Sequence, residues 1–201
     1  MKARLTGMMI VLVLGCIAPS LAAADDLTEN YARYAGFQVT GLLESFDDFG
    51  GLLDYENSFG LGARLGLRID GNSESMDYAF ELNINWYSSI DVDDAATGLK
   101  VAELDAFSVM LRPKVYATNL GSDVFEPYAF IGIGFMNGEL TIPSLSISAD
   151  ATELAFEIGV GSEWNVTDSM SLFAEVGYFQ PTGDLDDFPF VTIAGGLNYK
   201  F

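Results

Sequence analysis

Histidine is absent from this 201-residue chain, and cysteine occurs only once, as Cys16. The missing histidine excludes serine-histidine triads, histidine-assisted dyads and histidine-containing metal sites. Cys16 lies inside an expected export leader, so the exported chain has neither a cysteine nucleophile nor a disulfide. We therefore expect no enzyme, no metal site and no cofactor.

Basic residues are also scarce, with 9 Lys+Arg against 29 Asp+Glu and a net charge of −20. A phosphate backbone would be repelled by such a surface, which excludes nucleic acid as a partner. The mean hydropathy of +0.26 is nevertheless high for so acidic a chain. Beyond the leader, no apolar run approaches the ~18 residues that a transmembrane helix needs. The apolar residues must be dispersed along strands.

The first 24 residues have the composition of a secretory signal peptide. Lys2 and Arg4 form a basic start, residues 5–17 are largely apolar, and Ala22 to Ala24 provide a small-residue cleavage site. Residues 13–16 loosely resemble the lipobox of lipoprotein precursors, but Leu14 fits that pattern poorly. We expect cleavage after residue 24, which leaves a single domain over residues 25–201.

Three segments alternate apolar with polar or small side chains: residues 59–69, 78–86 and 154–164. Because side chains alternate across a strand, each segment has one apolar and one polar face. Fainter alternation covers residues 31–42, 102–116, 126–137 and 170–179, and a clear pattern runs through residues 191–201. The sequence therefore predicts an all-β fold of eight antiparallel strands.

The connections between these segments alternate in length. Short turns are expected at residues 71–73, 119–122 and 165–168, and longer loops near residues 43–57, 88–100, 138–151 and 180–189. This layout is typical of outer-membrane barrels, although a soluble lipocalin-like barrel would show the same alternation with its apolar face inward. Glycines on the polar faces suit a crowded lumen. Aromatic residues near strand ends are expected to form interfacial girdles, namely Phe59, Trp86, Trp164 and Tyr178.

The leader, the run from Pro127 to Phe135, the short turn before Met170 and the ending Tyr199-Lys200-Phe201 resemble the OmpA-type/OmpX/opacity-protein superfamily of small outer-membrane barrels. The resemblance implies an eight-stranded antiparallel transmembrane up-and-down β-barrel over residues 25–201. It further implies extracellular long loops and periplasmic termini. Leu197, Tyr199 and Phe201 would form the C-terminal signal for the barrel-assembly machinery. The implied partners are outer-membrane lipid and lipopolysaccharide, and we expect a monomer.

Charged side chains on the polar faces should meet inside such a barrel: Arg64, Arg68, Glu81, Arg112, Glu157 and Glu175. An eight-stranded lumen is just wide enough for side chains to fill, so we expect these groups to pair across it. A turn centred on residues 72 and 73 would place Glu81 beside Arg64. A turn around Val166 would place Glu157 near Glu175, where the two would repel unless Arg112 reaches between them or one is protonated.

Acidic residues are concentrated in the expected long loops, where Lys100 is nearly the only basic residue. These acids are Asp47, Asp48, Asp54, Glu56, Asp91, Asp93, Asp94, Asp150, Asp184, Asp186 and Asp187. The run from Asp91 to Asp94 lacks the further positions of an EF-hand loop, so a solvated acidic rim is favoured over a calcium site. Divalent cations bridging these loops to lipopolysaccharide phosphates are an alternative.

Three functions are consistent with these features. The first is a structural or surface-interaction role through acidic extracellular loops, and the second is a narrow or gated passive pore for small solutes or ions. A soluble periplasmic ligand-binding barrel is the remote third. The enzymes that share the barrel architecture depend on a catalytic histidine, which this chain lacks. No surface ligand can be named from the sequence.

Overall fold

The computed structural model describes residues 31–44, 53–55, 58–73, 75–94, 99–122, 124–142, 144, 147–186 and 188–201. The expected signal peptide and four of the loop acids lie outside these ranges: Asp47, Asp48, Glu56 and Asp187. Residues Ala32–Phe201 form one compact unit. That unit is the barrel.

Nine strands and two short 3-10 helices make up the described chain. The strands are β1 (Tyr31–Glu44), β2 (Leu53–Tyr55), β3 (Ser58–Ser73), β4 (Met76–Asp94), β5 (Leu99–Tyr116), β6 (Phe125–Ile142), β7 (Ile147–Thr167), β8 (Met170–Pro181) and β9 (Phe190–Lys200). The 3-10 helices are η2 (Thr118–Leu120) and η4 (Gly183–Leu185).

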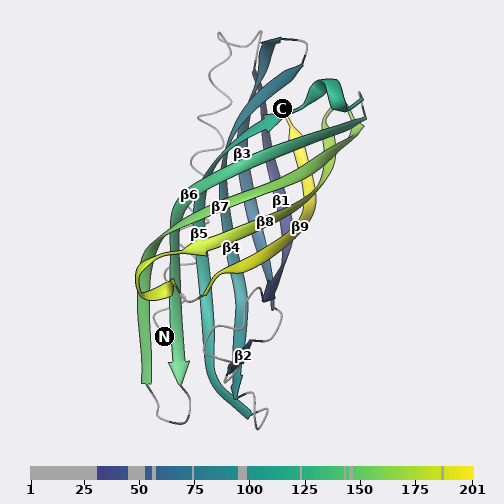
Figure 1. Ribbon diagram of the computed structural model, residues 1–201. Helices are drawn as coiled ribbons and strands as arrows, with labels where there is room; N and C mark the ends of the chain where they lie inside the picture. The colour runs from purple at the N-terminus through teal and green to yellow at the C-terminus, as the bar shows by residue number, and fades with distance from the viewer. Residues whose placement is uncertain are drawn as a thin grey trace. The chain divides into compact units, whose positions relative to one another are not determined.

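Eight of the strands close into an antiparallel ring, which confirms the predicted fold (Figure 1). Each strand pairs with its neighbours along the chain, and β1 pairs with β9 from Tyr34–Lys200 to Glu44–Phe190 to close the seam. The short β2, which the sequence pattern does not predict, stands outside the ring and pairs with the far end of β4. Closure of the ring pairs the backbone N–H and C=O groups that the edge strands of an open sheet would leave exposed.

The barrel has two unlike ends. At one, which we call the turn end, short connections join β3 to β4, β5 to β6 and β7 to β8, and the chain ends at Phe201. At the other, the hairpin end, β4 to β7 extend well past β8 and β9 (Figure 1). The expected loops at residues 88–100 and 138–151 are therefore largely strand: β4 and β5 pair as far as Asp94–Leu99, and β6 and β7 as far as Ile142–Ile147. The predicted loop boundaries were wrong because backbone pairing continues where the apolar alternation has ended.

The two faces of the wall differ as the alternation predicts. Large apolar side chains such as Phe80, Ile131 and Val160 are exposed on the outer face. The alternate positions are buried inside and include polar residues such as Gln38, Arg64 and Glu81. This apolar exterior and polar interior match a barrel surrounded by lipid.

Candidate functional site: the barrel interior

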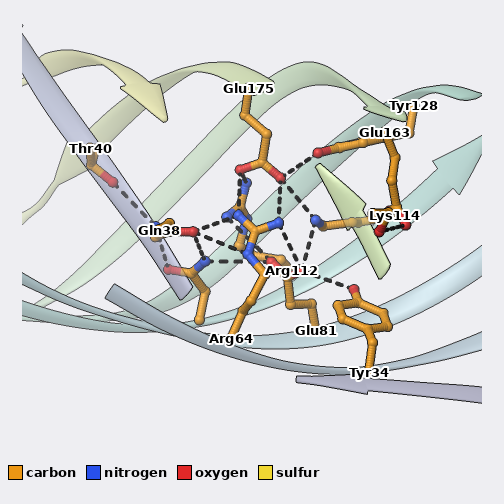
Figure 2. Close-up of polar contacts among 12 residues, drawn as sticks. Tyr34, Gln38, Thr40, Arg64, Glu81, Arg112, Lys114, Tyr128, Glu163 and Glu175 are labelled. Carbon is orange, nitrogen blue, oxygen red and sulfur yellow. Dashed lines mark hydrogen bonds and ion pairs between the residues drawn. The ribbon is translucent and has the colours of Figure 1, made fainter. Parts of the chain in front are cut away.

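Six ionisable side chains meet in the middle of the lumen, and we call them the central charge cluster: Arg64, Glu81, Arg112, Lys114, Glu157 and Glu175. Figure 2 labels five of them, Arg64, Glu81, Arg112, Lys114 and Glu175. They come from β3, β4, β5, β7 and β8, so the cluster links strands around most of the ring. Three cations face three carboxylates. The formal charges therefore balance, as buried ion groups require.

Glu175 is the acceptor at the centre of this cluster. Its carboxylate lies 2.7 Å from Arg112 Nη2, 3.0 Å from Arg64 Nη2 and 2.9 Å from Lys114 Nζ. It also accepts a hydrogen bond of 2.7 Å from the Tyr128 hydroxyl. Four donors around a carboxylate that is only 3% exposed fix its position tightly.

Glu81 is the second shared acceptor, and it is completely buried. Lys114 Nζ lies 2.8 Å from Glu81 Oε2, and the nearest nitrogens of Arg64 and Arg112 lie 3.4 Å from its carboxylate oxygens. The Tyr34 hydroxyl donates to Glu81 at 2.9 Å. Lys114 therefore bridges the two most buried carboxylates, although the sequence analysis did not single it out.

The predicted pairings need two corrections of register. Arg64 is opposite Asn83, and Glu81 is opposite Gly66, so Arg64 and Glu81 meet diagonally rather than side by side. The predicted turn centre was too early because β3 continues to Ser73 through an irregularity after Ile69.

The second correction concerns β7 and β8, where Glu157 is opposite Phe179 and Glu175 is opposite Gly161. The turn falls after Thr167, and a register irregularity precedes it. The two carboxylates are therefore not cross-strand neighbours. Arg112 still lies between them, with Nε 3.4 Å from Glu157 and Nη2 2.7 Å from Glu175.

Aromatic faces flank the cations of the cluster. The Arg64 guanidinium lies 3.5 Å from the centre of the Phe173 ring, and that of Arg112 lies 3.8 Å from the Phe130 ring. Lys114 Nζ lies 4.7 Å from the Tyr128 ring centre. These cation–π contacts occupy space that water would otherwise fill, so the centre of the lumen is packed.

The sixth predicted lumen residue, Arg68, belongs to a separate group at the turn end. Its Nη2 lies 2.7 Å from both Asp77 and Glu126. Lys200 Nζ lies 3.2 Å from Glu163 nearby. A cavity of about 170 Å³ is lined by four of these side chains, Arg68, Glu126, Glu163 and Lys200, together with Ala32, Tyr34, Tyr116 and Asn165.

The hairpin end of the lumen is apolar, which the sequence analysis did not anticipate. We call this group the mouth cluster: Leu42, Tyr87, Ala106, Met110, Met136, Ala155, Phe179, Leu185 and Phe190. The Phe179 and Phe190 rings are stacked, with their centres 4.8 Å apart, and the Tyr87 ring packs edge-on against Phe190 with a centre-to-centre distance of 5.7 Å. Leu185 comes from η4, so the β8–β9 connection supplies part of this packing.

A regular alternation signals which face a residue occupies but not which residues meet. Lys114 follows Arg112 by two positions, so its inward direction could have been read from the sequence. The polar partners Tyr34, Gln38 and Glu163 lie on strands far from the cations in sequence. Their contacts depend on register, which a pattern of period two does not fix.

The remaining predicted site residues lie on the outer wall. Phe59 and Tyr199 are more than half exposed. The ring centres of Trp86 and Phe107 are 5.1 Å apart, and those of Trp164 and Phe125 are 5.8 Å apart. Tyr178 is half-buried and donates to Gln180. Leu197 and Tyr199 lie on the outer face of β9, and Phe201, which follows the strand, is also exposed. The girdle and assembly-signal roles of these residues stay predictions.

Among the residues whose structure is described, no group of three or more His, Cys, Asp or Glu side chains could hold a metal ion. Within the same ranges, no helix has the length and hydropathy to cross a membrane.

Known proteins share this architecture. The chain matches the family Outer membrane protein beta-barrel domain over residues 8–201. Among solved structures it is similar to Ail, the attachment invasion locus protein of Yersinia pestis, with a TM-score of 0.55 and 14% identity over 86% of this chain and 98% of that one. Ail in complex with the heparin analogue sucrose octasulfate gives a TM-score of 0.50 and 15% identity over the same shares, 86% and 98%. Neisserial surface protein A gives a TM-score of 0.54 and 12% identity over 85% of this chain and 97% of that one.

No curated protein matches the chain by sequence. At identities this low, the solved structures show the fold alone, whereas the family match covers almost the whole length. The closed ring, the apolar outer wall and the family match agree on an outer-membrane location. The chain belongs to the outer membrane protein beta-barrel domain family.

Proposed function

We propose that this protein is a closed outer-membrane barrel that presents acidic β-hairpins as an interaction surface outside the membrane. The strand lengths carry the proposal. A tilted transmembrane strand needs about 9–11 residues, and β8 and β9, with 12 and 11 residues, are close to that length. β4 to β7 have 18 to 21 residues each.

The extra residues of these four strands form a projecting sheet. At about 3.3 Å per residue, some ten residues beyond the membrane would extend about 30 Å. The sheet is acidic, because the projecting parts of its four strands carry Asp91, Asp93, Asp94, Glu103, Asp105, Glu139, Asp150 and Glu153 with Lys100 as the one basic residue. Such a surface favours cationic partners and disfavours polyanions.

The projecting sheet also offers one open edge within the described chain. β7 pairs with β6 from Ile147 onward, but its pairing with β8 begins only at Ala155. An extended segment of a partner could add to such an edge through backbone hydrogen bonds. Ail has been crystallised with a heparin analogue. The negative charge of the present chain supports the opposite preference.

Binding of a cationic probe tests this proposal. In proteoliposomes with the hairpin end outward, fluorescent polylysine should bind in a salt-dependent manner and heparin should not. Asp150→Lys should weaken polylysine binding, because Asp150 is exposed on the projecting sheet. Asp168→Lys makes the same charge change in the exposed turn after β7, at the opposite end, and should leave binding unchanged. Equal effects of the two variants would contradict the proposal.

The alternative function is a narrow passive pore. The packed central charge cluster supports a closed lumen, so the unaltered protein should show no discrete channels in planar-bilayer recordings. Channels that disappear on Glu81→Ala or Arg64→Ala would establish the pore instead.

A further inference from the structure

We infer that the lumen is closed by two seals in series, with a layer of polar side chains between them along β1 and β4. The mouth cluster is the first seal, and the central charge cluster is the second. The inference goes beyond the proposed surface role, because that role needs only a lumen that does not conduct.

The mouth seal is built from almost every strand. Among the described residues, β3 is the one ring strand that supplies no side chain to the mouth cluster. At that level β3 has Gly60, whose lack of a side chain leaves space for the Tyr87 ring. A Cβ atom at Gly60 would lie 2.8 Å from Tyr87 Cδ1, so the Tyr87 ring occupies the space over β3. Stacked phenyl rings and aliphatic side chains offer no partner to a permeating ion or its water.

A lid formed by the β8–β9 connection completes this seal. The Thr182 backbone N–H and hydroxyl both donate to the Leu154 carbonyl oxygen, at 2.9 and 2.8 Å. Gly183 then turns the chain at a φ of 63°, and Leu185, which is 5% exposed, enters the mouth. A Cβ atom at Gly138 would lie 3.2 Å from Leu185 Cδ2, so this glycine leaves room for the lid residue.

The second seal is of a different kind and lies deeper. Its ion pairs and cation–π contacts fill the cross-section with charged groups, each of which has a partner of opposite charge. Beyond it, at the turn end, lies the cavity of about 170 Å³. Solvent entering from the turn end therefore reaches the charged seal, and solvent at the hairpin end meets the apolar one.

Polar side chains lie between the two seals along β1 and β4, whereas on β5 and β7 the two clusters adjoin at Met110–Arg112 and Ala155–Glu157. Along β1 the inward positions run from Gln38 through Thr40 to Leu42, and along β4 from Asn83 through Asn85 to Tyr87. Gln38 Nε2 donates to Asn85 Oδ1 at 2.6 Å and to Thr40 Oγ1 at 3.2 Å. Thr40 is only 1% exposed, so this polar layer has access to neither end.

A single cysteine in the polar layer tests the inference. Thr40→Cys is nearly isosteric, and the chain without its leader has no other cysteine. In oriented proteoliposomes, a charged methanethiosulfonate reagent should label the Thr40→Cys variant from neither side. Asn165→Cys, in the turn-end cavity, should be labelled from the turn side and serves as the positive control.

Opening each seal should expose the thiol of the Thr40→Cys variant from one side only. The mouth variant Leu185→Ser with Phe190→Ser should permit labelling from the hairpin side. The centre variant Arg112→Ala with Glu175→Ala removes one cation and one carboxylate, so the cluster stays balanced, and it should permit labelling from the turn side. Channels in planar bilayers should appear only when all four substitutions are combined.

Several results would overturn the inference. Labelling of Thr40→Cys in the otherwise unaltered barrel would mean that one seal is absent. Labelling from the same side in both opened variants, or channels from either variant alone, would leave a single barrier. Heat-dependent gel mobility verifies that each barrel is folded, and labelling of Thr40→Cys alone still overturns the inference if an opened variant fails to fold. Polylysine binding is measured separately, so loss of the surface role is distinguishable from loss of the two seals.

Discussion

Glu175 shows how much a single buried side chain can hold together. It joins Arg64, Arg112 and Lys114, which lie on two other strands, and it accepts a hydrogen bond from Tyr128 on a third. Removing one partner of a buried ion group leaves the others charged and unpaired, which costs more than the group contributed on balance. The stability of the barrel should therefore be unusually sensitive at this position.

Glu175→Gln should lower the free energy of unfolding by about 3–5 kcal/mol, the range found for broken buried ion pairs. The shape of the side chain is retained, so the loss comes from the uncompensated cations. Asp77→Asn is the matched control: Asp77 is partly exposed, and its partner Arg68 keeps Glu126. Asp77→Asn should lower the free energy of unfolding by less than about 1 kcal/mol. Urea unfolding in lipid vesicles, followed by the fluorescence of Trp86 and Trp164, measures both, and equal losses would contradict the expectation.

The sequence predicts which residues face the lumen much better than which ones touch. Arg64 and Glu81 could be assigned to the interior because each lies in a regular alternation. The mouth cluster could not be anticipated in the same way. Phe179 and Phe190 are apolar residues on the inner face, and an alternation of polarity assigns such residues to the outside or leaves them unassigned.

At the scale of the strands, existence and order were predictable and register was not. Residues 59–69, 78–86 and 154–164 all lie within strands, and the eight ring strands occur in the predicted order. The register depends on where each turn falls, and an irregularity near a turn shifts every pair beyond it. Both turns fall later in the chain than predicted, after Ser73 and after Thr167, and this difference accounts for the two wrong pairings, although the irregularities at Ile69/Ser73 and Asn165/Thr167 offset part of it.

The open edge of β7 leads to a prediction at the same scale. Charged side chains discourage a strand edge from pairing with another copy, and Asp150 is exposed on this edge strand. Asp150→Thr should therefore increase concentration-dependent dimer formation severalfold in analytical ultracentrifugation. Glu139→Thr removes the same charge from the residue directly opposite on β6, whose two edges are both paired. It should leave the barrel monomeric, and dimers from both variants would point to net charge instead.

For the whole molecule, the distribution of basic residues makes its orientation measurable. Arg64, Arg68, Arg112 and Lys114 lie in the lumen, and Arg33 and Lys200 lie near the turn end. Lys100 is the basic residue of the projecting hairpins, at the start of β5. The hairpin end is therefore the place where trypsin can reach a cleavage site without entering the barrel or crossing the membrane.

Trypsin added to intact cells should cut the folded protein once, after Lys100, and the two fragments should stay together until the sample is heated. Lys100→Gln should abolish the cut, and heat-unfolded protein should be cut at other basic residues as well. If intact cells protect the protein and only permeabilised cells allow the cut, the hairpin end faces the periplasm and the proposed orientation is reversed.

The seam between β1 and β9 has a consequence for biosynthesis. It joins the two ring strands that are farthest apart in the chain, with Phe201 N–H donating to the Arg33 carbonyl oxygen at 3.0 Å. Every other pairing in the ring is between neighbours in sequence and closes only a short loop, whereas this one must bring distant segments together. A nascent chain can thus form hairpins as it emerges, but no ring exists until the final strand has been delivered.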